Sequence, residues 1–129
     1  MELVRWNQLV HDIKGDDIQR MVESSELLMK ESTAEDIPRL LELLTHTDFV
    51  VREAAAWPLS IVGGPEYLPQ LFDAYQKGFD DGHDNDGFTA ALIELIELHL
   101  DAGRSKLEEL RTSTNLNYKK HASWLSEFC

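Results

Sequence analysis

The sequence predicts an all-α protein of about seven or eight helices. Apolar residues recur at the three- and four-residue spacing of a helix along most of the chain. No segment alternates apolar and polar residues over a useful length, as a half-buried strand would. An approximate internal repeat indicates that the helices stack in pairs. We therefore expect one short α-solenoid domain over residues 1–129.

The first two helices follow from their apolar stripes and their end signals. The first stripe occupies residues 6–13, and Gly15 closes the segment. The second stripe occupies residues 18–29 and follows Asp16 and Asp17. Aspartates suit a helix start, where backbone N–H groups are unpaired.

The next two helices carry clearer boundary signals. Thr33 and Asp36 resemble a capping box, so we expect a third helix over about residues 34–45. Asp48 starts the fourth helix, and Gly63 ends it. We expect Gly63 to adopt the positive backbone torsion that commonly stops a helix.

Four further stripes complete the chain. They predict a fifth helix within residues 68–79, a sixth within 88–99, a short seventh around 107–110 and an eighth within 118–128.

The helices repeat with two different offsets. Residues 37–44 match residues 68–75 at an offset of 31, whereas residues 51–62 match residues 88–99 at an offset of 37. About six extra residues must therefore lie within residues 76–87, and we expect them to form a loop. Insertions in helical repeats usually fall on one face, which is often the binding face.

Two runs in the chain resemble a HEAT repeat of the bacterial HEAT-like type. They are DIPRLLELL and, after a turn with Asp48, VREAAAWPLSIVGGPEYLPQLF. The resemblance rests on Pro early in the first helix, Asp in the turn, Val-Arg and small Ala residues in the second helix, and Gly before the next unit. It implies a right-handed α-solenoid whose second helices line a concave surface. The implied organisation is a clear repeat at 34–79, a second repeat with a loop insertion at 65–102, and degenerate capping helices at 1–31 and 104–129.

Arg52 of the Val-Arg pair is expected on the surface, beside Asp48 one turn earlier. A surface ion pair of this kind contributes about 0.3–0.5 kcal/mol. We therefore expect it to stabilise the turn and to carry no function.

Composition limits the classes of partner. The net charge of −12 disfavours nucleic acid, because an acidic surface repels phosphate. The single cysteine, Cys129, excludes an internal disulfide and a thiolate metal cage. Residues 1–15 lack the apolar core of a signal peptide, and no run of about 18 apolar residues occurs. We expect a cytoplasmic protein without a membrane partner.

The acidic residues are concentrated in one part of the chain. Residues 66–101 hold nine acids and one base, Lys77, a net charge of −8. We call the expected loop within residues 76–87 the acidic loop, and we expect it to continue into an acidic ridge on the sixth helix. The predicted partner-binding residues are Trp57, Asp80, Asp81, Asp84, Asp86, Glu94, Glu97 and Asp101.

Structural roles compete with this interpretation. The acids also suit ordinary solubility, and Asp84, Asn85 or Asp86 can cap the sixth helix. Trp57 lies off the apolar stripe of its helix, yet it can equally pack against a neighbouring repeat.

No residue set predicts catalysis, a cofactor or a metal. In the loop GFDDGHDNDGF, placing Gly87 at the required glycine of a calcium loop puts Gly82 and Ile93 at its first and last ligand positions, and neither has a carboxylate. The five histidines are scattered, and His99 and His121 fall on apolar stripes. We expect no enzymatic activity and no cofactor.

Two functions fit these features. The first is a protein-binding module, in particular an immunity protein that neutralises a basic toxin domain. In size, charge and fold the chain resembles immunity proteins of polymorphic or contact-dependent toxin systems. The alternative is a scaffold or assembly factor that binds a peptide or subunit. HEAT-like DNA glycosylases need a basic groove, whereas this chain is acidic there.

Overall fold

The computed structural model describes all residues from Met1 to Cys129 and contains helices without strands. The α-helices are α1 (Leu3–Lys14), α2 (Ile18–Glu31), α3 (Ile37–Leu44), α4 (Phe49–Val62), α5 (Leu68–Asp80), α6 (Asp86–Leu98), α7 (Leu100–Arg111) and α8 (Leu116–Leu125). Three short 3-10 helices occupy Ala34–Asp36, Pro65–Tyr67 and Ser126–Phe128. The prediction of an all-α fold with about seven or eight helices is confirmed.

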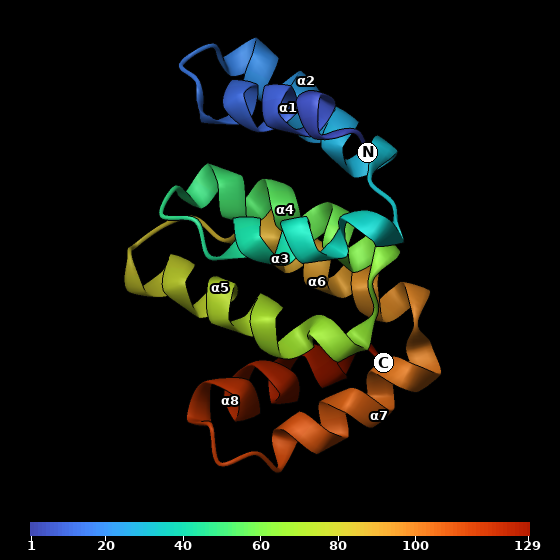
Figure 1. The fold of residues 1–129 in the computed structure, drawn as a ribbon. Coiled ribbons are helices and arrows are strands. Elements are labelled where there is room, and N and C mark those ends of the chain that lie inside the picture. The colour runs from blue at the N-terminus through green and yellow to red at the C-terminus, as the bar shows by residue number, and fades with distance from the viewer.

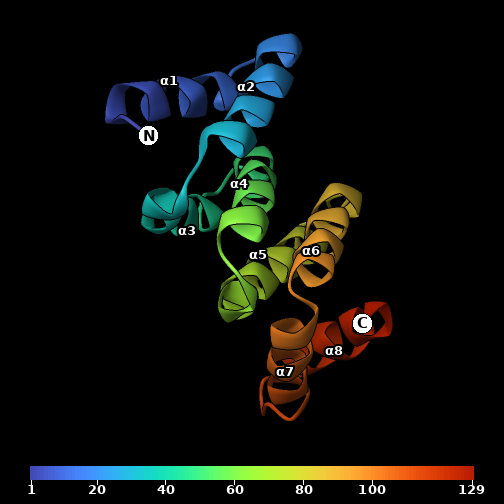
Figure 2. The same cartoon turned by 90° about the vertical axis from the view of Figure 1, so that its right-hand side faces the viewer.

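The helices stack as successive pairs, which gives an all-α HEAT-like solenoid (Figure 1). Helix α1 packs on α2, and α3 packs on α4. Figure 2 shows α1 and α3 on one side of the stack, with α2, α4 and α6 following one another on the other side. The last pair, α7 and α8, closes the stack through contacts of α8 with α5 and of α7 with α6.

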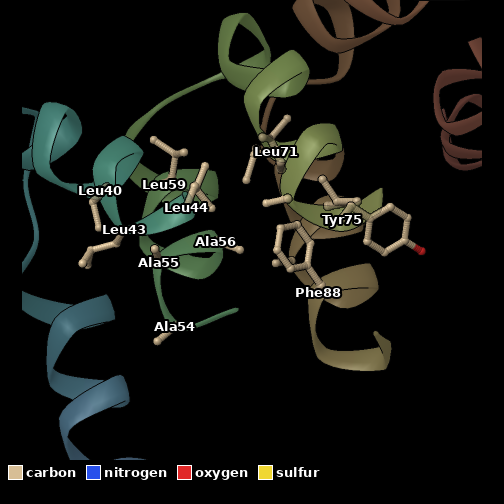
Figure 3. Packing of buried hydrophobic residues seen from close by; sticks show 14 of the residues in the cluster. Leu40, Leu43, Leu44, Ala54, Ala55, Ala56, Leu59, Leu71, Tyr75 and Phe88 are labelled. Carbon is tan, nitrogen blue, oxygen red and sulfur yellow. The ribbon is translucent and has the colours of Figure 1, made fainter. Parts of the chain in front are cut away.

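Small side chains on α4 let several helices approach it closely. Ala54, Ala55 and Ala56 are all buried, and α4 contacts α1, α2, α3 and α6. Figure 3 shows leucines of α3 beside Leu59 of α4, with Phe88 of α6 further along the same core. An alanine brings little bulk to a helix crossing, so neighbouring backbones can pack closely.

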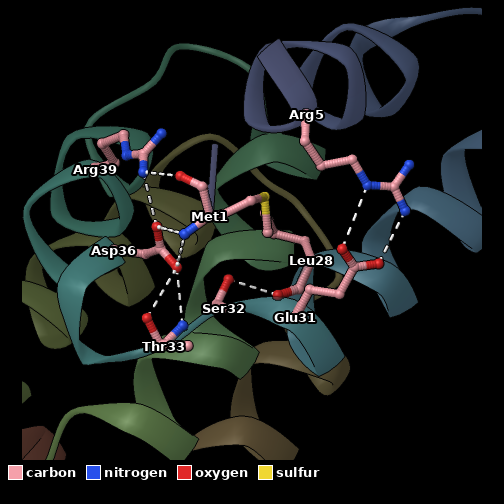
Figure 4. Close-up of polar contacts among 8 residues, drawn as sticks. All are labelled: Met1, Arg5, Leu28, Glu31, Ser32, Thr33, Asp36 and Arg39. Carbon is pink, nitrogen blue, oxygen red and sulfur yellow. Dashed lines mark hydrogen bonds and ion pairs between the residues drawn. The ribbon is translucent and has the colours of Figure 1, made fainter. Parts of the chain in front are cut away.

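Polar contacts join Met1, just before α1, to the start of α3 (Figure 4). Buried Asp36 accepts the Thr33 N–H at 2.8 Å, as the predicted capping box requires. The Met1 ammonium lies 3.2 Å from the Asp36 carboxylate, and Arg39 lies 2.9 Å from it. Burial alone would raise the pKa of Asp36, but the Thr33 amide and the Met1 ammonium outweigh it and lower that pKa. A second ion pair, between Arg5 and Glu31, joins α1 to the end of α2.

The extra residues of the second repeat mostly lengthen a helix, so the expectation of a loop is wrong. Helix α3 has 8 residues, whereas α5 has 13 and continues through Gln76–Asp80. The following connection, residues 81–85, is one residue longer than residues 45–48. The added turn of helix is held by α8, because Gln76 hydrogen-bonds His121 at 2.9 Å and Phe79 stacks on the same ring. His121 is buried, as its place on an apolar stripe predicted.

Gly63 ends α4 for a different reason from the expected one. Its φ is −85°, so it does not use the left-handed region. A Cβ at Gly63 would lie 2.6 Å from the Leu59 carbonyl oxygen and 2.9 Å from the Tyr67 ring. Glycine is therefore required there by the close approach of both the last turn of α4 and the next segment.

This packing predicts opposite outcomes for two neighbouring glycines. Gly63→Ala forces a methyl group against backbone and should lower the free energy of unfolding by about 1–3 kcal/mol. Gly64→Ala is the matched control, because the nearest atom to its added Cβ is a flexible Glu66 oxygen at 3.9 Å. It should be neutral or slightly stabilising. Urea unfolding of both variants measures the difference, and equal stabilities would contradict the packing explanation.

Candidate partner-binding surface

Between its two ends, helix α4 leaves a narrow strip of side chains accessible. Glu53, Trp57 and Ile61 follow one another at four-residue spacing along this strip. Glu53 and Trp57 are half-buried, and Ile61 is 41% exposed. Trp57 thus has both a packing contact and an accessible surface.

Trp57 lies in a groove between α2 and α4. The groove has two adjoining hollows of about 260 and 250 Å³ that share Trp57, Ala54, Ser25 and Glu26. The other lining residues are Met21, Val22, Met29, Val50 and Glu53. The wall is therefore apolar apart from two carboxylates and one hydroxyl.

The accessible strip of α6 repeats that of α4. The alignment that pairs Val51 with Phe88 also pairs Trp57 with Glu94 and Ile61 with Leu98. Leu98 is 50% exposed, so both helices end their strips with an accessible apolar side chain. Because α2, α4 and α6 lie side by side, their strips form one surface. We call it the α2–α4–α6 face, defined by Val22, Glu26, Glu53, Trp57, Ile61, Glu94 and Leu98.

Arg52 is buried, so its predicted surface pairing with Asp48 is wrong. Its guanidinium donates to the carbonyl oxygens of His46 at 2.9 Å and Thr47 at 3.0 Å. It also lies 3.8 Å from the Asp81 carboxylate, while Asp48 instead caps the Val50 N–H. A buried charge needs such partners to offset its lost hydration.

Asp81 therefore anchors the acidic loop to the body of the protein. Its carboxylate lies 3.1 Å from Lys77 in addition to its contact with Arg52. The hydrogen bond from Lys77 outweighs the effect of burial and lowers the pKa of Asp81. Next to it, His83 stacks on Phe49 with ring centroids 4.4 Å apart. The loop between α5 and α6 is thus held against the turn between α3 and α4.

The other acids in and beside this loop are exposed and make no ion pair. Asp80 accepts a hydrogen bond from Gln76 at 2.8 Å, and Asp84 accepts the Asp86 N–H at 2.9 Å. Asp84 therefore satisfies the first N–H of α6. Asn85 does not cap the helix through its side chain, because that side chain is buried and donates to the Tyr75 carbonyl oxygen.

The predicted acidic ridge is shorter than expected. Helix α6 ends at Leu98, and His99 adopts a non-helical φ of −137° and ψ of 57°. Asp101 consequently belongs to the first turn of α7, and the ridge on α6 ends at Glu97. Glu94 is half-buried on the α2–α4–α6 face, whereas Asp86 and Glu97 are exposed without an ion-pair partner. The participation of all eight residues in binding stays a prediction.

Glu53 belongs with the candidate residues, although sequence reasoning missed it. Its carboxylate lies against Gly87 in the first turn of α6, where any added Cβ would meet it. Burial raises the pKa of Glu53, and the negative charge of Asp84 raises it further. Glu53 thus joins the Trp57 strip to the acidic loop. Its position one turn before Trp57 is the sequence signal that could have identified it.

No group of three or more His, Cys, Asp or Glu side chains is placed to hold a metal ion. No helix combines the length and the apolar character needed to cross a membrane.

Comparison with known families supports the repeat architecture. The family model described as HEAT repeats matches residues 20–83, which run from α2 through the loop after α5. Together with the stack of helix pairs, this match supports a HEAT-repeat protein, and HEAT repeats generally mediate protein–protein interaction. No curated protein and no solved structure matches the chain.

The raised pKa of Glu53 predicts a pH-dependent loss of stability. In the unfolded chain this carboxyl has its usual pKa of 4.5, so the folded protein retains the proton to higher pH. Its ionisation disfavours the folded state, and stability attributable to Glu53 falls as the pH rises above about 4.5. Urea unfolding should show Glu53→Gln more stable than the wild type at pH 7 and no more stable at pH 4. Glu97→Gln is the control, and an equal gain for both variants would contradict the assignment.

Proposed function

We propose that this protein is a binding module for a basic protein, with the α2–α4–α6 face and the adjoining acidic loop as its docking surface. The proposal rests on one observation: accessible apolar side chains and acids without ion-pair partners lie together on this face. Val22, Ile61 and Leu98 are each at least 41% exposed on this face. Glu26, Glu53 and Glu94 lie among them and make no ion pair.

The two kinds of residue serve different steps of binding. Acids without cationic partners attract a basic protein over long range and accelerate its association. Apolar and aromatic anchors then slow its release, because a few well-packed side chains carry most of an interface's binding energy. Trp57 is the anchor in this scheme, since its indole lies in the groove between α2 and α4.

The more specific proposal is an immunity protein that neutralises a cationic toxin domain by covering its active-site cleft. It is supported by the small size, the net charge of −12 and the HEAT-like fold. The alternative is a scaffold or assembly factor that holds a peptide or subunit on the same face. In either case the partner is a protein, and no catalytic role is proposed.

Capture from a native extract tests the basic-partner proposal. The tagged wild type should retain a basic protein that is released as the salt concentration increases, because salt screens the attraction. Asp84→Lys combined with Glu94→Lys should slow association and weaken capture while leaving helicity intact. Glu42→Lys combined with Glu127→Lys makes the same charge change at exposed sites elsewhere and should capture normally. Capture that is indifferent to salt and to the first variant would contradict the proposal.

Growth of a host distinguishes the two specific functions. If the partner is a toxin domain, its expression should arrest growth, and co-expression of the wild type should restore it. The Asp84→Lys and Glu94→Lys variant should restore growth less well, because its capture of the toxin is slower. A scaffold would instead bind its partner without any effect on growth. A large toxin reading frame beside the gene would favour the immunity function.

A further inference from the structure

The groove between α2 and α4 has an apolar floor and an acidic rim. Met21, Met29 and Ala54 supply apolar floor, and Trp57 lines both hollows. Glu26 lines both hollows as well, and Glu53 lines one of them. With volumes of about 260 and 250 Å³, the hollows fall below the roughly 300–1,000 Å³ of small-molecule pockets. Their size suits single long side chains from a partner.

The two carboxylates at the rim have no partner within the protein. Glu26 and Glu53 make no ion pair, and neither accepts a hydrogen bond from a side chain. The Ser25 hydroxyl is already used, because it donates to the Met21 carbonyl oxygen at 2.8 Å. Asp84, the charged group that acts on Glu53, is also negative. The rim therefore has an excess of acceptors and lacks a cation.

We propose that this groove holds an arginine side chain of the basic partner, an inference that rests on the proposed function. The methylene stem would lie over Met21 and Ala54, where it replaces water on an apolar surface. The guanidinium would lie against the Trp57 indole and donate charge-assisted hydrogen bonds to both carboxylates. Arginine fits better than lysine, because its planar group stacks on aromatic rings and is more weakly hydrated.

Titration with a small arginine compound tests this site directly. N-acetyl-arginine methylamide should produce a saturable shift of the Trp57 indole N–H signal in ¹H–¹⁵N spectra, assigned with Trp57→Phe. The indole signals of Trp6 and Trp124 should not move. N-acetyl-citrulline methylamide has nearly the same shape without the charge, and N-acetyl-lysine methylamide has the charge without the planar group. Both should bind more weakly than the arginine compound.

Removal of the rim charges supplies the second measurement. Glu26→Gln combined with Glu53→Gln should raise the dissociation constant of the arginine compound about tenfold, the size expected from lost charge-assisted hydrogen bonds. Glu42→Gln combined with Glu127→Gln makes the same charge change away from the groove and should leave it unchanged. Circular dichroism of both variants verifies that the helices are intact.

Three outcomes would overturn the inference. They are a Trp57 signal that does not shift, equal binding of the citrulline or lysine compound, and unchanged binding by the Glu26→Gln and Glu53→Gln variant. If the partner is still captured in a salt-dependent way, such a result removes the arginine site alone. If salt-dependent capture also fails, both the arginine site and the proposed function are contradicted.

Discussion

Close packing around α4 determines which parts of this protein remain accessible. Helices α1, α2, α3 and α6 all contact α4, and its three consecutive alanines are buried among them. A bulkier side chain at these positions would separate the helices, because a packed core accepts extra volume only at a cost in stability. Between its two ends, the helix is consequently enclosed except along the strip of Glu53, Trp57 and Ile61. On this helix, a partner can therefore contact only the side chains of that strip and of the helix ends.

A buried cation then places the acidic loop beside that surface. Arg52 donates to two carbonyl oxygens of the turn before α4 and faces Asp81 of the loop before α6. Its Nε and Nη2 atoms are buried without a hydrogen-bond partner, so Asp81 at 3.8 Å is the closest compensation for that side of the guanidinium. A buried charge that loses a partner destabilises a protein strongly. Asp81 therefore has a structural role beside the binding role predicted for it, whereas Asp84 and Asp86 make no ion pair.

The helices were predictable from the sequence because their signals are local. Asp48 and the pair Thr33–Asp36 act as caps in the structure, as their spacing indicated. The errors concern features that depend on distant residues. The extension of α5 is stabilised by His121 on α8, and no pattern within residues 76–87 reports that contact. Likewise, spacing alone assigned Arg52 to the surface, whereas its partners in the preceding turn and in the later loop allow it to be buried.

The candidate site was predicted in part for the same reason. Sequence reasoning identified Trp57 and the acids around it, since composition and periodicity reveal an off-stripe aromatic residue and a concentration of charge. It missed the groove, because Glu26 lies 31 residues before Trp57 and only the packing of α2 on α4 brings them together. It also extended the acidic ridge to Asp101, since the break at His99 has no glycine or proline to announce it. The position of Glu26 at the groove depends on tertiary structure, which the local pattern does not report.

The function proposed for this protein depends on a partner that binds on the α2–α4–α6 face. Hydrogen–deuterium exchange of the protein, free and in complex with its captured partner, tests it most directly. Exchange should become slower on binding in residues 21–29, 53–61 and 84–97, with little change in α1, α3 and α8. Protection confined to those three helices, with α2, α4 and α6 unchanged, would contradict it.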